Sequence, residues 1–448
     1  MDTKIQKLTE GNPTKLIFAF GLPVLVGNLF QQLYNIADSM IVGRFVGTDG
    51  LAAVGAVSSL QFFFMSFCMG MSSGIGIIIA QSFGANNEKR VRKSVVNGVF
   101  LAALVAVLMS VVGIVFAEKC LDIMGTPPEI ITDATRYMQS TCIGILGIAM
   151  YNTVAEMLRA LGDSRTPLYF LIAATLTNIV LDLIFIIGFD MGVLGAGVAT
   201  ATSQYLAAIG VAVFAYKKNK YFHVHRNELK LDKEVIRSCI GTGLPVACQF
   251  SLIAVSCIVM QSIVNGFGAI LVATYTITCK LEQVVAQGYQ MLTTALQAYS
   301  GQNIGAGEEQ RVRQGFRSGM TIMLLYTLCV VPIMFFGGEF IVQCFVSDPL
   351  VIERGATALK IGSISYIFLG MIYVTRGILN GLGDTLFAFM GGVMEVIGRV
   401  CFTKPITLIP GVGAWGIWIA TGLTWAATGI LGYVRFKQEK WTYKKQDK

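Results

Sequence analysis

The feature that most constrains the fold of this chain is a succession of long apolar segments. A helix needs about 20 apolar residues to cross a bilayer core of ~30 Å. Only 13% of the residues are charged and the mean hydropathy is +0.66, whereas about 25% of the residues of soluble domains are charged. The sequence therefore predicts an all-α integral membrane protein with twelve transmembrane helices, at residues 16–43, 50–80, 94–117, 132–156, 167–188, 192–216, 238–264, 270–300, 318–337, 355–378, 385–408 and 412–434.

Basic residues are distributed unevenly over the connections between these spans. If both termini and every even-to-odd connection lie on one side, that side holds 26 of the 34 Lys and Arg residues. Such an excess of positive charge marks the cytoplasmic side. The sequence thus predicts that both termini are cytoplasmic. The formal net charge of +8 indicates topology and contact with anionic membrane lipids, and not with nucleic acid.

The two halves of the sequence repeat one another at an offset of 221 or 222 residues. Because each half has six spans, both repeats enter the membrane in the same sense, and we expect two six-helix bundles related by a pseudo-twofold axis along the membrane normal. This organisation predicts an N-terminal lobe at 1–216, a cytoplasmic linker at 217–237 and a C-terminal lobe at 238–448. The recurring motifs are Gly21–Val24 and Gly243–Val246, Gln81–Ala85 and Gln302–Ala306, and Leu161–Asp163 and Leu382–Asp384.

A proline occupies a matched position early in the first span of each repeat. Pro23 and Pro245 each remove one backbone hydrogen bond from a helix and favour a kink. A hinge in the first helix of each lobe is the functional interpretation, and a static bend is the alternative.

One predicted span carries a carboxylate together with an amide one helical turn away. Asp182 follows Asn178 by four residues, so the two side chains share a face of the helix. A charge inside a span costs at least ~2.5 kcal/mol, and such a residue marks a functional site by default. At a rise of ~1.5 Å per residue, Asp38, Asp182 and Thr200 lie ~8–12 Å from the outer ends of their spans.

These four side chains, Asp38, Asn178, Asp182 and Thr200, are the expected site for a coupling cation or proton. Two carboxylates in a low-dielectric pocket are not both charged cheaply, so either one takes a proton or a cation bridges them. The oxygens of Asp, Asn and Thr suit Na⁺. The alternative is an Asp that only hydrogen-bonds a neighbouring helix, and the shared depth of the four groups favours the ion site. No other metal site is expected.

The second half has intramembrane charges of its own. Two are positive and two are negative, so mutual neutralisation between neighbouring helices is the simpler interpretation. A role in gating is the alternative. The four residues of this predicted charge network are Lys280, Glu282, Glu395 and Arg399.

Aromatic and methionine residues occur in several spans and could line a substrate cleft. They would suit flat apolar cations through stacking and adaptable thioether contacts, although each residue taken alone is more often part of the core. The candidate cleft residues are Tyr34, Phe62, Met65, Met69, Met150, Tyr151, Tyr275 and Met291, together with Gln249.

The sequence lacks the residue patterns of an enzyme. No G-x-x-x-x-G-K-[ST] motif for ATP binding occurs, and the only two histidines, His223 and His225, lie in one basic loop. The ten cysteines are scattered singly without metal-ligand spacing, which indicates small apolar residues. We therefore expect no enzymatic activity, and no cofactor apart from a coupling ion, H⁺ or Na⁺.

Taken together, these motifs resemble the multidrug and toxin extrusion (MATE) transporters along essentially the full chain. The resemblance rests on the combination of twelve spans in two halves with five short motifs. These are Asn35-Ile36-Ala37-Asp38, Leu51-Ala52-Ala53-Val54-Gly55, Gln81-Ser82-Phe83-Gly84-Ala85, Arg159-Ala160-Leu161-Gly162-Asp163 and Asn178-x-x-x-Asp182.

The resemblance implies a secondary-active antiporter that exports organic, mostly cationic, drugs by alternating access in exchange for H⁺ or Na⁺. It also implies a multi-pass protein of the bacterial inner membrane that acts as a monomer. Asp38, Asn178, Asp182 and Thr200 match the coupling-ion site that bacterial branches of the family have in the N-terminal lobe. Another branch has a Glu in span 7 and an Asp in span 10. This sequence has Gln249 in the former region and no acid in span 10, so we expect coupling in the first lobe only.

Two other functions remain as alternatives at this stage. A lipid-linked precursor flippase shares the two-lobe architecture, but it would favour a strongly cationic central cavity. The intramembrane cations are few here, and Lys280 and Arg399 each have an acid nearby in the sequence. An intramembrane enzyme is disfavoured because no nucleophile or metal cluster is present in the spans.

Overall fold

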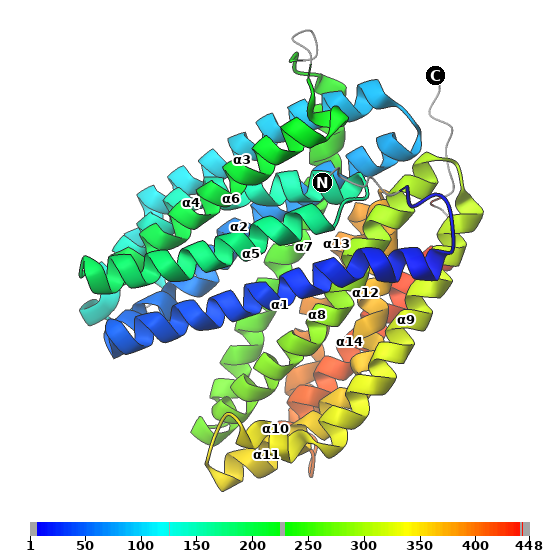
Figure 1. Ribbon diagram of the computed structural model, residues 1–448. Coiled ribbons are helices and arrows are strands. Elements are labelled where there is room, and N and C mark those ends of the chain that lie inside the picture. The colour runs from blue at the N-terminus through cyan, green and yellow to red at the C-terminus, as the bar shows by residue number, and fades with distance from the viewer. Residues whose placement is uncertain (1–6, 125, 225–228, 440, 442–448) are drawn as a thin grey trace. The chain divides into compact units, whose positions relative to one another are not determined.

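The computed structural model describes residues 7–124, 126–224, 229–439 and 441, and long helices dominate these ranges (Figure 1). One π-helical segment, η1, continues α5. The elements are α1 Pro13–Phe45, α2 Thr48–Gly84, α3 Glu88–Ile123, α4 Pro128–Ala160, α5 Arg165–Asp182, η1 Leu183–Gly188, α6 Gly192–Lys218, η2 Lys220–Phe222, α7 Lys233–Asn265, α8 Ala269–Gly305, α9 Glu309–Phe336, α10 Gly338–Gln343, α11 Pro349–Ile364, α12 Tyr366–Gly381, α13 Thr385–Thr407, η4 Gly413–Trp415 and α14 Gly416–Lys437.

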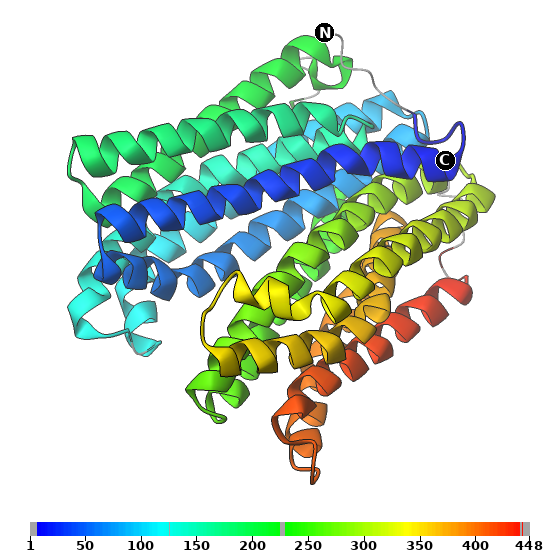
Figure 2. The ribbon, with the colours of Figure 1, turned by 60° about the horizontal axis from the view of Figure 1, so that its bottom comes forward.

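The prediction of an all-α protein with twelve transmembrane helices is confirmed. Within the described ranges, 11 helices are long and apolar enough to cross a membrane, and the pair α11 and α12 brings the number to 12 if it forms one span. This pair bends by 48° at Ser365, the residue between the two helices. The sequence pattern predicted a single span at 355–378 there, because apolar composition does not reveal a break. The pair and the short helix α10 can be followed in Figures 1 and 2.

The internal repeat is visible in the backbone as well as in the sequence. Helices α2 and α8 each have 37 residues and begin and end at positions 221 apart. The glycines before them, Gly47 and Gly268, have φ values of 100° and 89°, a region that L side chains rarely adopt. Gly162 and Gly383, which precede α5 and α13, repeat this pattern with φ values of 91° and 85°. The turns that start equivalent helices are therefore built alike.

The chain forms two compact units whose limits fall inside two helices. Unit 1 contains Val26–Cys248, and unit 2 contains Leu8–Leu25 together with the chain from Gln249 onward. Helix α1 is continuous (Figures 1 and 2), and it leaves unit 2 for unit 1 just after Pro23. Helix α7 leaves unit 1 for unit 2 just after Pro245. The three-part division at 216 and 237 stays a prediction. Contacts assign the first part of α1 and of α7 to the unit built by the other repeat.

In unit 1, α4 packs closely on α6 because small residues line their contact. A Cβ on Gly144 would lie 3.1 Å from the Cα of Ala201, and one on Gly197 would overlap with Ser140 Oγ. Small residues at such contacts let membrane helices approach closely. This packing fixes the position of Thr200, which lies one turn after Gly197 on α6.

Replacing Gly197 with valine is expected to destabilise unit 1 by about 1–3 kcal/mol, because the added atoms overpack the contact with α4. Gly241→Val on α7 is the matched control, since a Cβ at Gly241 meets nothing within 4 Å. Thermal unfolding of both variants in detergent measures the difference. Equal stability of the two variants would show that α4 and α6 separate without cost.

The segment between α6 and α7 is fixed to α3 by polar contacts. Asp232 accepts a hydrogen bond from Lys93 Nζ at 2.9 Å, and its backbone N–H donates to Asn97 Oδ1 at 2.8 Å. The hydrogen bond from Lys93 is the main reason that the pKa of the Asp232 carboxyl lies below its ordinary value. His223 in this segment is exposed, and His225 lies outside the described residues.

Candidate functional site

Asp182 lies where the helical geometry of its span changes. It is the last residue of α5 and directly precedes the π-helical segment η1. Single π-type turns occur frequently at functional sites, because they re-aim side chains within a helix. The Asp182 side chain is completely buried, as is that of Asn178. Neither a bilayer nor the protein interior tolerates an isolated charge well, so this carboxylate needs a partner, a proton or a cation.

Asn178 connects Asp182 to α6. Its amide nitrogen and oxygen are exchanged by a flip of the side chain, and the hydrogen-bond network decides between the two orientations. In one orientation Nδ2 donates to Thr200 Oγ1 at 3.5 Å. In the other, Nδ2 donates to Asp182 Oδ2 at 3.0 Å and the amide oxygen accepts from the Thr200 backbone N–H at 3.2 Å. The second orientation satisfies both atoms and joins the three residues.

Helix α1 adds Asp38 and Tyr34 to the same group. The Tyr34 hydroxyl lies 3.0 Å from Thr200 Oγ1, and both side chains are buried. Asp38 is 9% exposed, and its charge interacts with that of Asp182. The structure therefore brings together the four residues that the sequence analysis proposed. Their role as an ion site stays a prediction.

Each of the two carboxylates keeps one oxygen free of hydrogen bonds. Oδ1 of Asp38 and Oδ1 of Asp182 are buried, and neither has a partner among the described residues. A buried polar atom without a partner costs free energy. These two oxygens are therefore ready acceptors for a proton or ligands for a cation.

Sequence reasoning missed Tyr137 on α4. Its side chain is buried, and its hydroxyl lies within electrostatic range of Asp38, Tyr34 and Asp182. Tyr34 was proposed only as a cleft residue, whereas the structure places its hydroxyl on Thr200. No sequence signal separates these two tyrosines from the others, because aromatic residues are common in all spans.

The other candidate cleft residues lie in different environments. Phe62 and Met69 on α2 are 44% and 39% exposed. The others pack inside the units: Met65 and Met150 against core clusters of unit 1, Tyr151 with its hydroxyl on the Pro167 carbonyl, Tyr275 edge-on to Trp418, and Met291 against Gly21. Phe62 and Met69 are the most exposed of the candidate cleft residues.

The charges of unit 2 pair differently from the sequence-based expectation. Glu395 accepts a hydrogen bond from Arg376 at 2.8 Å, within an ion pair whose side chains are only 7% and 11% exposed. Arg376 was not among the four residues of the predicted charge network. Glu282 interacts electrostatically with Arg399, and Arg399 also donates to Cys257 Sγ at 3.6 Å. Lys280 is exposed.

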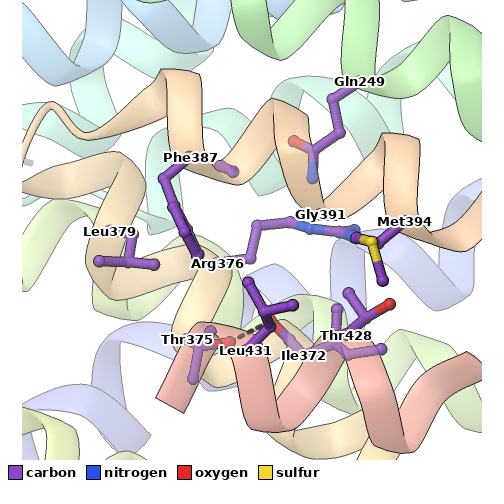
Figure 3. A pocket seen from close by; sticks show the side chains of 12 residues that line it. Gln249, Ile372, Thr375, Arg376, Leu379, Phe387, Gly391, Met394, Thr428 and Leu431 are labelled. Atoms are coloured by element: carbon purple, nitrogen blue, oxygen red, sulfur yellow. Dashed lines mark hydrogen bonds between the residues drawn. The ribbon is translucent and has the colours of Figure 1, made fainter. Parts of the chain in front are cut away.

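A small hollow lies beside this ion pair, between α7, α12, α13 and α14. The Gln249 and Arg376 side chains point into it (Figure 3). Gln249 is 1% exposed, and neither its amide nitrogen nor its oxygen has a hydrogen-bond partner among the described residues. The remaining lining is mainly apolar: Ile372, Thr375, Leu379, Phe387, Ala388, Gly391, Met394, Thr428, Leu431 and Gly432. The Arg376–Glu395 ion pair and the Gln249 amide form a polar patch with no net charge.

In the described part of the chain, no group of three or more His, Cys, Asp or Glu side chains could hold a metal ion. Na⁺ does not require such a group, because amide, hydroxyl and carbonyl oxygens also serve as its ligands.

Comparison with known proteins places the chain among characterised families. A sequence model of the MatE family matches residues 23–184 and again residues 245–401, once in each repeat. The probable multidrug resistance protein YpnP of Bacillus subtilis is 27% identical over 444 residues, which cover 98% of both chains. The probable multidrug resistance protein NorM of Thermotoga maritima is also 27% identical, over 83% of this chain and 81% of its own.

Solved structures agree with this assignment at the level of the fold. A structure described as the outward-facing conformation of a multidrug resistance MATE family transporter of the MOP superfamily superposes with a TM-score of 0.93. It is 21% identical, and the superposition covers 100% of both chains. The family matches in both repeats together cover well over half of the sequence. The chain therefore belongs to the MatE family of membrane transporters.

Proposed function

We propose that this protein is a secondary-active multidrug exporter that exchanges organic compounds for H⁺ or Na⁺ by alternating access. The observation that carries the proposal is the buried group of Asp38, Asn178, Asp182 and Thr200 in unit 1. The relatives YpnP and NorM are named probable multidrug resistance proteins, which supports drugs as the class of transported compound.

The geometry of the site explains how an ion would act on it. With both carboxylates charged, Asp38 and Asp182 repel one another in a low-dielectric surrounding. A proton on one carboxylate, or a Na⁺ bound by the two free Oδ1 atoms, removes that repulsion and draws α1 toward α5 and α6. Without the ion, α1 moves away from α5 and α6. Ion binding therefore favours one of two arrangements of α1 over the other. A transport cycle needs an ion that binds the two conformations with different affinity.

The prolines provide the place where α1 and α7 could bend. Pro23 and Pro245 lie just before the points at which these helices pass from one unit to the other. A missing backbone hydrogen bond at such a point lets the two parts of a helix change direction. We propose that the ion-induced shift of α1 uses Pro23 as a hinge. A Pro23→Ala variant should then export more slowly, and unchanged export would favour a static bend.

The proposal also covers the location of the protein, its topology and its partners. The distribution of basic residues supports cytoplasmic termini, and the relatives from bacteria support the inner (plasma) membrane as the location. The transported partners are small, mostly cationic organic compounds, and the protein acts as a monomer among membrane lipids. H⁺ or Na⁺ is the only cofactor proposed.

The function is tested with purified protein in liposomes that contain the cationic dye ethidium on the side from which it is exported. An opposing gradient of either H⁺ or Na⁺ should accelerate dye movement, and collapse of that gradient by an ionophore should stop it. The ion that drives movement is the coupling ion. A rate of dye movement that is independent of both gradients would contradict ion-coupled export. Movement of a lipid-linked phosphate instead of dye would favour the flippase.

A further inference from the structure

Part of the exposed surface of α8 is polar. Thr276, Lys280 and Gln283 are exposed, and Gln287 is half-buried. Their spacing of four, three and four residues puts them on one side of the helix. We call these four residues the α8 polar stripe. Val284 is an exposed apolar residue beside them.

Other membrane helices expose a different kind of surface. From residue 324 to 336 the exposed residues of α9 are apolar, and so are those of α3 from residue 100 to 116. Such faces suit contact with lipid chains. The residues are Leu324, Leu325, Leu328, Ile333 and Phe336 on α9, and Phe100, Leu104, Val107, Leu108, Val111 and Val115 on α3. The α8 polar stripe does not fit lipid and therefore faces water.

Lys280 lies deep along the helix. It is 11 residues from the first residue of α8, which corresponds to ~16 Å at the usual rise, in a membrane core of ~30 Å. Among the described residues no ion pair includes Lys280. An ammonium group at this depth faces a water-filled passage or bundle interior.

The neighbouring acids are engaged elsewhere. Glu395 pairs with Arg376, and Glu282 interacts with Arg399. The α8 polar stripe therefore carries one surplus positive charge. The charge is not repeated in α2, where Ser59 stands at the offset of 221 residues from Lys280. At the offset of 221 residues Gln283 corresponds to Phe62 of α2, an aromatic residue that is 44% exposed.

From these observations we propose that the α8 polar stripe binds the carboxylate of transported small molecules, with Lys280 as the residue that determines this specificity. The ammonium group and the Gln283 amide nitrogen are donors, and a carboxylate accepts several hydrogen bonds at once. The substrates are then amphiphiles that carry an acidic group, including zwitterions, and not only cations. This inference rests on the proposed export function.

The test uses two dyes that share one cationic ring system: rhodamine B, which has a free carboxylate, and its ethyl ester, in which the carboxylate is blocked. Export of both is measured in liposomes with the wild type, Lys280→Gln, Lys280→Arg and Lys360→Gln. Lys360 is an exposed lysine on α11 and serves as the control. The Lys280→Gln variant should lose about tenfold or more in kcat/KM for rhodamine B, as expected for a charge-assisted hydrogen bond. Export of the ester, which the positive charge opposes, should rise.

Lys280→Arg should keep the preference for rhodamine B, and Lys360→Gln should leave the ratio of the two dyes as in the wild type. Equal losses for both dyes in Lys280→Gln would overturn the inference, because they would indicate a merely structural lysine. Export of the ester but not of rhodamine B by the wild type would overturn it as well. If the wild type moves neither dye under any ion gradient, the proposed export function itself fails.

Discussion

Replacing Asp182 with asparagine should reduce ion-driven drug export to the level of membranes without the protein. The substitution keeps the shape of the side chain and the oxygen that accepts from Asn178 in the favoured amide orientation. It removes the group that takes a proton or a share of a cation, so the site no longer distinguishes the ion-bound from the ion-free state. Dye efflux against an imposed gradient measures the loss.

The Asp182 variant should remain folded. Its carboxylate is completely buried, and loss of a buried charge without a cationic partner relieves a desolvation cost instead of creating one. Thermal unfolding should therefore occur at the wild-type temperature or above. Asp190→Asn is the matched control, because Asp190 is exposed in the following loop and its φ of 51° is one that asparagine tolerates. Normal export by Asp182→Asn would refute the proposed coupling site.

The second large effect concerns the buried ion pair of unit 2. Arg376→Met leaves Glu395 buried without its cation and is expected to destabilise the protein by about 3 kcal/mol, at the lower end of the ~3–5 kcal/mol for such pairs because the adjacent hollow admits water. Removing both charges in Arg376→Met/Glu395→Leu should recover most of this loss. Replacement of a buried pair by apolar side chains of similar size is often neutral.

Unfolding of the two single variants and the double variant in detergent measures this coupling as a double-mutant cycle. The control is Arg313→Met, which breaks an ion pair with Glu439 whose side chains are 38% and 48% exposed. That change should cost less than ~1 kcal/mol. If Arg376→Met costs no more than the control, the pair is hydrated and does not stabilise unit 2.

The sequence predicted those aspects of the structure that depend on local chemistry and on distance along one helix. Segment length and hydropathy identified the spans, because crossing a bilayer requires a minimum number of apolar residues. Counting residues from the ends of the spans placed Asp38, Asp182 and Thr200 at similar depths. The structure brings these residues together with Asn178.

Features that depend on lateral neighbours could not be predicted. Glu395 lies four residues from Arg399 in the sequence, but its partner in the structure is Arg376 on α12. The approach of Tyr137 to the carboxylates depends on how α4 packs, and composition does not contain that information. The same holds for the passage of α1 and α7 from one unit to the other, since a continuous helix has no sequence mark where its neighbours change.

The most direct test of the central claim is the ion flux that a drug induces. Purified protein in liposomes is supplied with ethidium on one side, and the movement of H⁺ and of Na⁺ to the other side is followed. The account predicts that ethidium starts a flux of one of these ions in the opposite direction, and that Asp182→Asn abolishes this flux while Asp190→Asn preserves it. An ion flux of wild-type size in Asp182→Asn, or ethidium transport without movement of either ion, would contradict it.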